Sequence, residues 1–273
     1  MKKKYYSKKH KEKKGKKAKI KTILYSLLFI LLIFGIGYFT RMEQFKIKEV
    51  NISGTDDEYI KGILNLVEDS LSEKSFLWIV SRGSIFTYNK NEIKKDILKN
   101  FPKVDRLIIN KGGDNNLDIK ISEREADYLW CTKECYLADI EGVAYEIVDE
   151  QYTAGDLLRV KDDISNINLG EYVYEKEDFD NINILVKNIE KKGNEIVMFN
   201  ILKDTHFNIL LDTDTILKFT ALKDLEDQFN NYDLTFSEKN NDLNIEIYEY
   251  IDLRFDNKVY TKKKEEVEME VEI

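Results

Sequence analysis

The longest apolar run in the chain lies near its N-terminus. The 17 residues from Ile23 to Phe39 carry no charged side chain. At about 1.5 Å per residue, residues 22–40 form a helix of roughly 28 Å, close to the thickness of a hydrocarbon core. The run is too long for the core of a cleaved signal peptide and is not followed by a small-residue cleavage site. The pattern therefore predicts an uncleaved transmembrane helix over residues 22–40.

The charges on either side of this run predict its direction. Residues 1–21 contain twelve lysines and one glutamate, a formal charge of +11, whereas the other side begins with Arg41 and Glu43. Because lysine-rich flanks stay in the cytoplasm, we expect a single-pass protein of the cell (inner) membrane with residues 41–273 outside. The basic tail (residues 1–21) is expected to be a disordered, solvated segment that orients the anchor. Its charge also suits anionic lipid headgroups, and nothing in it is typical of nucleic-acid binding.

Beyond the membrane, hydrophobic periodicity predicts a β-α-α-β-β unit within residues 41–124. Apolar residues recur at helical spacing over residues 58–71 and 90–99, and Asn89 or Asn91 can cap the second helix. Phe101-Pro102 ends that helix, because the residue before a proline avoids the helical region. Alternating apolar positions predict strands over residues 45–52, 104–110 and 117–122.

The next part of the chain, residues 125–260, has the pattern of a β-rich domain with flanking helices. Helices are predicted over residues 175–192 and 221–229, with residues 216–219 leading into the second. Short strands are predicted over residues 128–131, 136–140, 143–147, 195–202 and 207–211, and the longest strand over residues 243–253. Residues 261–273 are expected to be a frayed, charged tail. The fold class predicted for the whole chain is α+β.

Composition and motifs give no sign of an enzyme. The net charge of −8 combines the +11 of the basic tail with −19 on the remaining chain. The only histidines are His10 and His206, and the chain has no Ser-x-x-Lys motif, P-loop or G-x-G-x-x-G sequence. We therefore expect no catalytic activity, no cofactor and no small-molecule substrate.

Two cysteines, Cys131 and Cys135, fall at the turn of a predicted hairpin. A disulfide across this turn is plausible outside the cytoplasm, and two free buried thiols are the alternative. A zinc site needs about four ligands, and His206 is the only other soft ligand outside the membrane. No metal site is expected.

Two sequence signatures, placed behind this anchor, resemble the bacterial cell-division proteins FtsQ and DivIB. The first ends the β-α-α-β-β unit and has the family pattern L-x-I-x-I-x-E-R followed by a tryptophan. The second, Ile-Asp-Leu-Arg-Phe at residues 251–255, matches the family's closing signature. The resemblance spans about residues 20–260, but the proline that usually follows Glu-Arg in the family is missing here. The first signature is carried by Leu117, Ile119, Ile121, Glu123, Arg124 and Trp130.

The resemblance implies a fold and a function. It implies a POTRA domain over residues 41–124 and a non-catalytic scaffold of the divisome at the division septum. Its partners would be FtsB/DivIC-like and FtsL-like bitopic proteins, and its role would be to support septal cell-wall assembly.

The resemblance also implies a partner-binding site in the terminal strand, at Arg254, Phe255 and Asn257. We expect this strand to be an exposed sheet edge that a partner strand can extend. For Arg254 the alternative is a pair with Asp252 on the same strand face, and for Phe255 it is a place in the core. Glu123 and Arg124 are expected to form a local ion pair at the domain junction, and a direct contact with a partner is the alternative.

Two other functions remain open. A membrane-anchored extracytoplasmic ligand sensor would need a concave apolar pocket with convergent polar groups. Another POTRA-bearing envelope protein would keep the fold, but POTRA proteins of outer-membrane export continue into a long β-barrel that this chain lacks.

Overall fold

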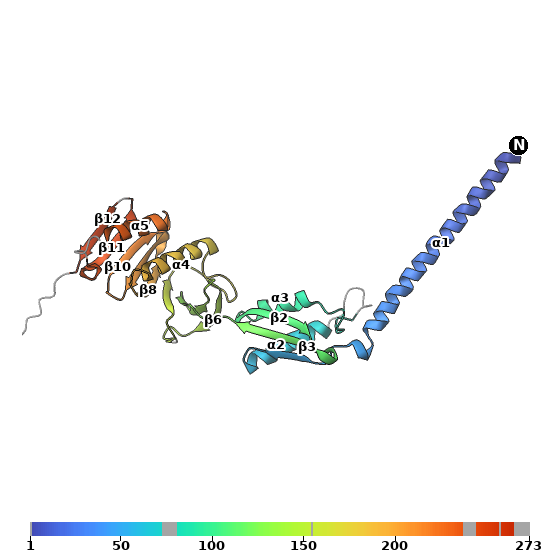
Figure 1. Ribbon diagram of the computed structural model, residues 1–273, viewed down its shortest axis with the longest axis horizontal. Coiled ribbons are helices and arrows are strands. Elements are labelled where there is room, and N and C mark those ends of the chain that lie inside the picture. The colour runs from blue at the N-terminus through green and yellow to red at the C-terminus, as the bar shows by residue number, and fades with distance from the viewer. Residues whose placement is uncertain (1, 73–80, 154, 237–243, 257, 265–273) are drawn as a thin grey trace, which may run out of the picture. The chain divides into compact units, whose positions relative to one another are not determined.

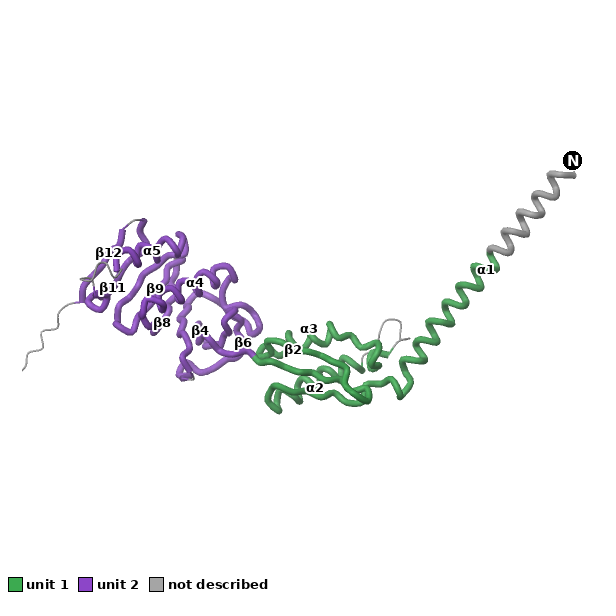
Figure 2. Tube along the Cα trace, in the orientation of Figure 1, with its two compact units in different colours: residues 1–123 green, residues 124–273 purple. Residues whose placement is uncertain are grey.

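The computed structural model describes residues 2–72, 81–153, 155–236, 244–256 and 258–264, with side chains from residue 19 onward except that of Asp204. The chain divides into two compact units, residues 1–123 and residues 124–273 (Figure 2). A long N-terminal helix and a large β-sheet confirm the mixed α+β class. Figure 1 shows the elements in chain order.

The N-terminal helix, α1 (Lys2–Thr40), contains the predicted apolar run. Within it, Lys19–Thr40 is the one described helical stretch long and apolar enough to cross a membrane. Fourteen large apolar side chains between Ile20 and Phe39 are exposed, which is unfavourable in water and favourable in lipid. The helix begins about twenty residues before its predicted start, and the expectation of a disordered basic tail is wrong for its backbone. Lysine and alanine are good helix formers, so the helix continues into the tail.

Besides α1, the described part of unit 1 contains a three-stranded sheet and two α-helices. Its elements are β1 (Val50–Ser53), α2 (Asp57–Ser72), α3 (Lys90–Asn100), β2 (Val104–Lys111) and β3 (Leu117–Glu123). The sheet order is β1-β3-β2, with β1 parallel and β2 antiparallel to β3. Both predicted helices are confirmed. Asn89 caps α3 by accepting a hydrogen bond from the backbone N–H of Glu92.

The core of unit 1 follows the predicted periodicities. Ile63 and Val67 of α2 and Ile93 and Ile97 of α3 are almost fully buried. They form one cluster with alternate residues of the sheet, Leu107, Ile109, Leu117, Ile119 and Ile121. The first strand is shorter than predicted, because Ile47 donates to the carbonyl of Gly83 and only residues 50–53 join the sheet ladder.

Unit 2 contains one nine-stranded sheet and two helices, α4 (Lys176–Glu190) and α5 (Leu225–Thr235). Its strands are β4 (Tyr128–Cys131), β5 (Cys135–Ala138), β6 (Ala144–Val148), β7 (Leu158–Asp162), β8 (Ile196–Ile201), β9 (His206–Leu211), β10 (Ile216–Thr220), β11 (Tyr248–Phe255) and β12 (Lys258–Lys263). The strand order is β12-β11-β10-β9-β8-β7-β4-β5-β6. The main core is formed by apolar residues of α4 and α5 and by inward-facing residues of the sheet, such as Trp130, Phe199 and Phe219.

The structure corrects three predictions in unit 2. Strand β7 was not predicted, and residues 216–220 form strand β10 and not the approach to a helix. Helix α5 begins at Leu225, where Asp224 caps it, and Leu222 is 72% exposed outside the helix. The longest strand, β11, begins at Tyr248 because residues 245–247 form a 3₁₀ turn. Leu243 lies outside the described residues.

The prediction that the longest strand is an exposed sheet edge is also wrong. Strand β11 lies between β10 and β12, so its backbone groups are paired on both sides. The outermost strand is β12, which uses residues that were assigned to the end of the β domain and to a frayed tail. A sheet's edge is decided by pairing between distant segments, and the alternating pattern of one segment does not reveal it.

Glu123 and Arg124 each have a partner within their own unit. Lys103 lies 3.4 Å from the Glu123 carboxylate, and Thr55 donates a hydrogen bond to it. Arg124 instead pairs with Asp139 within unit 2, and both side chains are nearly buried.

Candidate interaction edge

Strand β12 forms one margin of the large sheet. It pairs antiparallel with β11, with Ile251 opposite Thr261 and Asp252 opposite Tyr260. No strand among the described residues pairs with its outer side. An edge strand presents a row of unpaired N–H and C=O groups, so β12 can template the addition of another strand.

The neighbouring strand β11 holds this edge in place. Ile251 and Leu253 are fully buried in the core of unit 2. At the start of β11, the Thr215 hydroxyl lies 2.9 Å from the carbonyl oxygens of both Ile245 and Tyr248. The edge is therefore built on a rigid, buried strand.

Arg254 points along β11 toward Asp252. Its Nε lies 2.8 Å from Asp252 Oδ1, and its Nη2 lies 2.5 Å from Asp252 Oδ2. Burial alone would raise the pKa of the Asp252 carboxyl, but the side-chain and backbone hydrogen bonds from Arg254, with the charges of Arg254 and Lys218, hold it below its ordinary value. The structure thus contains the intramolecular pair that sequence analysis left open. Arg254 has little freedom to clamp a partner carboxylate.

Phe255 lies on the surface, not in the core. Its side chain is 45% exposed and meets Tyr260 of β12, which is 50% exposed, edge to face with ring centroids 4.9 Å apart. Such paired aromatic rings are the usual anchors of protein–protein interfaces. Asn257, the third predicted site residue, lies outside the described residues. Sequence analysis missed Tyr260, although its run of Val, Tyr and Thr is typical of a strand.

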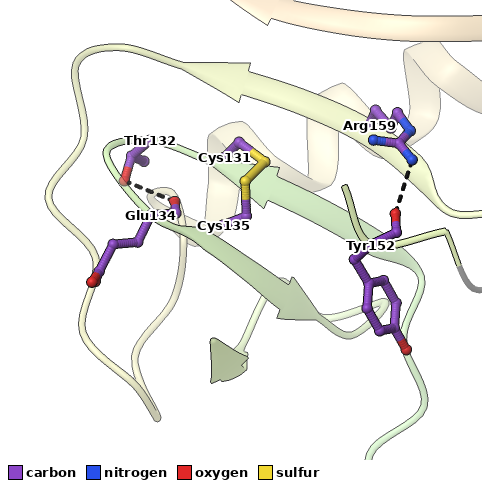
Figure 3. The surroundings of a disulfide bond; sticks show 6 residues. All are labelled: Cys131, Thr132, Glu134, Cys135, Tyr152 and Arg159. Atoms are coloured by element: carbon purple, nitrogen blue, oxygen red, sulfur yellow. Dashed lines mark hydrogen bonds between the residues drawn. A yellow bond between two sulfur atoms is a disulfide. The ribbon is translucent and has the colours of Figure 1, made fainter. Parts of the chain in front are cut away.

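The Cys131–Cys135 disulfide joins the hairpin strands β4 and β5, which lie near the other end of the strand order from β12 (Figure 3). The two cysteines face each other across β4 and β5, and Thr132 and Glu134 close the turn with a 2.8 Å backbone hydrogen bond. Oxidised sulfurs are poor metal ligands. Among the described residues, no group of three or more His, Cys, Asp or Glu side chains could hold a metal ion.

Removing this disulfide is expected to destabilise unit 2 only modestly. The closed loop is very short, so the chain-entropy model gives about 2 kcal/mol. We expect the Cys131→Ala/Cys135→Ala variant to unfold at a lower urea concentration than the oxidised wild-type protein. Reductant should shift the wild-type midpoint to that of the variant and leave the variant unchanged. An equal shift in both proteins would show that the effect does not come from this bond.

Two cavities bear on ligand binding. One of about 230 Å³ is lined by α4, by the start of α5 and by residues around His206, whose buried Nδ1 has no hydrogen-bond partner among the residues that the structure describes. The other, of about 390 Å³, lies beside the disulfide and is lined by several charged side chains, Arg159 among them. Pockets for small molecules are mostly apolar with a few polar groups and enclose about 300–1,000 Å³. Neither cavity combines that size with that lining.

Comparison with known proteins adds no family assignment. No protein-family profile matches the chain, and no curated protein matches its sequence at a significant level.

Proposed function

We propose that this protein is a non-catalytic divisome scaffold of the FtsQ/DivIB type. In this proposal it binds FtsB/DivIC-like and FtsL-like bitopic proteins outside the membrane and supports septal cell-wall assembly. The observation that carries the proposal is the closing signature, Ile-Asp-Leu-Arg-Phe, in the strand β11 that supports the sheet's open edge.

Unit 1 fits the POTRA part of the proposal. Its elements run β-α-α-β-β, and both helices pack their apolar faces into the sheet's core. The first sequence signature falls on β3, where Leu117, Ile119 and Ile121 are all buried. Its glutamate and arginine fall at the division between the two units. This is where a signature that ends one domain and begins the next should lie.

The partner strand is proposed to dock on β12 and not on β11. No strand in the described part of the chain pairs with the outer side of β12, whereas β11 is paired on both sides. A partner segment added there gains main-chain hydrogen bonds, and its side chains can pack on the Phe255–Tyr260 pair. Arg254 then acts as a positioning residue that fixes the end of β11 through Asp252.

The orientation of the chain is proposed from two independent features. The +11 charge of residues 1–21 favours a cytoplasmic N-terminus. The Cys131–Cys135 disulfide suits an oxidising compartment on the other side of the membrane. Both features favour a cell-membrane protein whose residues 41–273 lie outside the cytoplasm. The septum as its site of action is proposed from the sequence resemblance alone.

The test is partner recovery from membranes by the Phe255→Ala/Tyr260→Ala variant of the full chain. Loss of an aromatic anchor costs about 2 kcal/mol, which is roughly thirtyfold in Kd, so we expect partner recovery to fall at least tenfold. Recovery is measured by co-purification and mass spectrometry. Leu222→Ala, which removes a 72% exposed side chain outside this pair, is the matched control and should recover the partners as the wild type does.

A fluorescent fusion tests the cellular part of the proposal. A midcell band is expected for the wild-type protein and for the control variant. A uniform membrane signal, with no division protein among the co-purified proteins, would contradict the divisome role and favour a sensor. Full recovery of division partners by the Phe255→Ala/Tyr260→Ala variant would contradict docking at β12 but not the divisome role.

A further inference from the structure

The end of α1 is tied directly to the rest of unit 1. Thr40, the last residue of α1, is buried, and its hydroxyl accepts a hydrogen bond from the backbone N–H of Ser81 at 3.3 Å. After the short turn that follows α1, the carbonyl of Phe45 accepts a hydrogen bond from the backbone N–H of Ile85 at 2.9 Å. These contacts hold residues 81–85 beside the last turn of α1.

Three phenylalanine rings lead from α1 onto the surface of unit 1. The ring centroids of Phe39, in the last turn of α1, and Phe45 are 4.2 Å apart, and those of Phe45 and Phe86 are 5.5 Å apart. Phe86 is 62% exposed, although its neighbour Ile85 is buried. An exposed phenylalanine ring is unfavourable in water and favourable in lipid. The exposed apolar surface of α1 thus continues through Phe45 to Phe86.

A lysine lies beside the outermost of these rings. Lys111, at the end of β2, is exposed, and its Nζ lies 5.2 Å from the centroid of the Phe86 ring. The tip of the same β2–β3 hairpin is fixed next to α1, because the side-chain amide of Asn115 donates to the carbonyl of Gln44 at 2.6 Å. An apolar ring with a lysine beside it suits the membrane–water interface, where rings insert at the level of the headgroups and lysine ammoniums reach the phosphates.

The acidic residue in the turn after α1 does not oppose a contact with lipid. Glu43 is the only acidic residue between Thr40 and Phe45. Its carboxylate forms an ion pair with Lys46, three residues further along the chain. The negative charge of this turn is therefore compensated within the turn itself, and it adds little repulsion toward lipid phosphates.

We propose that this juxtamembrane patch (Phe39, Phe45, Phe86 and Lys111) rests on the membrane surface at which α1 ends, with the Phe86 ring inserted among the lipid headgroups. Continuity with α1 identifies lipid as the occupant. Phe39 belongs to Lys19–Thr40, the stretch long and apolar enough to cross a membrane. The two ring contacts put Phe86 no more than about 10 Å from Phe39, which is the scale of the headgroup layer.

The contact gives unit 1 a second point of attachment beside α1. A helix on its own can tilt in the membrane and carry unit 1 with it, whereas a helix and an inserted ring together restrict that tilt. One ring is too small an anchor to hold unit 1 on a membrane after α1 is removed. The contact requires α1 to lie in a membrane and is independent of the proposed divisome role.

The Phe86→Trp variant of the full chain tests the contact in lipid nanodiscs that contain phosphatidylcholine and phosphatidylglycerol in equal parts. Subtracting the wild-type fluorescence removes the signal of the two native tryptophans, Trp78 and Trp130. Brominated phosphatidylcholine quenches an indole in the membrane, and acrylamide quenches an indole in water. We expect brominated lipid to quench the Phe86→Trp variant about threefold more than the control variant Leu222→Trp, which replaces a 72% exposed side chain of unit 2.

Quenching of the Phe86→Trp variant by acrylamide alone, to the extent seen for Leu222→Trp, would overturn the inference. Protection from both quenchers would also overturn it, because the ring would then be covered by protein and not by lipid.

Lys111→Glu, introduced into the Phe86→Trp variant, tests the charge in the patch. It places a carboxylate beside the lipid phosphates, so quenching by brominated lipid should fall about twofold. The matched control is Lys120→Glu, at an exposed lysine of β3, which should leave the quenching unchanged. An equal fall with both lysine variants would show a general effect of charge and overturn the role of Lys111.

Discussion

Deletion of residues 1–40 is expected to move the protein completely from the membrane to the soluble fraction. The stretch Lys19–Thr40 exposes fourteen large apolar side chains, and no other helix among the described residues is long and apolar enough to cross a membrane. Each such side chain contributes about 1.5–3 kcal/mol on leaving water, so the stretch contributes some tens of kcal/mol. Without this stretch, we expect all of the protein in the soluble fraction and none in the membrane pellet.

The measurement is extraction of membranes with alkaline carbonate followed by immunoblotting. Deletion of residues 2–18 is the matched control, because it removes most of the basic charge and leaves the apolar stretch intact. The control protein should stay in the pellet, although its orientation can change. A protein lacking residues 1–40 that still pellets would show that another surface binds the membrane.

The sequence predicted the elements whose signals are local. Helix α2 places Ile63 and Val67 at helical spacing on the buried face, and α3 begins directly after its Asn89 cap. Strand β3 alternates buried and exposed residues from Leu117 onward. Periodicity and capping are properties of a short window, so these elements can be derived without knowing their neighbours.

The elements that were missed depend on distant neighbours. In strand β7, Val160 is the single nearly fully buried apolar residue, flanked by Arg159 and Lys161, and the strand is held by parallel pairing with β4 and β8. Strand β12 carries three lysines among six residues and lies at an edge, where polar side chains cost little. Each strand offers too few apolar residues for a clear alternating pattern: β7 has Leu158 and Val160 toward the core, and β12 has Val259.

The geometry of the candidate site also depends on distant neighbours, so the sequence predicted only part of it. The closing signature falls on β11, the strand beside the edge strand β12. The intramolecular Asp252–Arg254 pair was among the alternatives, since both side chains lie on one strand face. The exposure of Phe255 and its contact with Tyr260 depend on the β11–β12 register, which shifts between Asp252 and Phe255. Residue spacing within one segment carries no information about such a shift.

Replacement of Trp130 by alanine is expected to unfold unit 2 under conditions in which the wild-type protein is stable. Trp130 is 1% exposed, its ring lies 6.1 Å from that of Phe179, and its Nε1 donates to Asp162 at 3.2 Å. Truncating a buried tryptophan to alanine costs about 3–5 kcal/mol. Asp162 is itself fully buried and would lose one of its hydrogen-bond donors, which adds to the cost. The sum is comparable with the whole stability of an average domain.

The Trp130→Phe variant separates packing from the hydrogen bond. It keeps an aromatic ring beside Phe179, loses the donor to Asp162 and leaves a smaller void than alanine does. The lost hydrogen bond is expected to cost about 1–3 kcal/mol. Urea unfolding followed by circular dichroism should show the transition of unit 2 shifted far in the alanine variant and less in the phenylalanine variant. The core of unit 1 shares no residue with this cluster, so its transition should not move. Equal, small shifts in both variants would mean that Trp130 does not organise the core of unit 2, and a shift in unit 1 would mean that the two units unfold together.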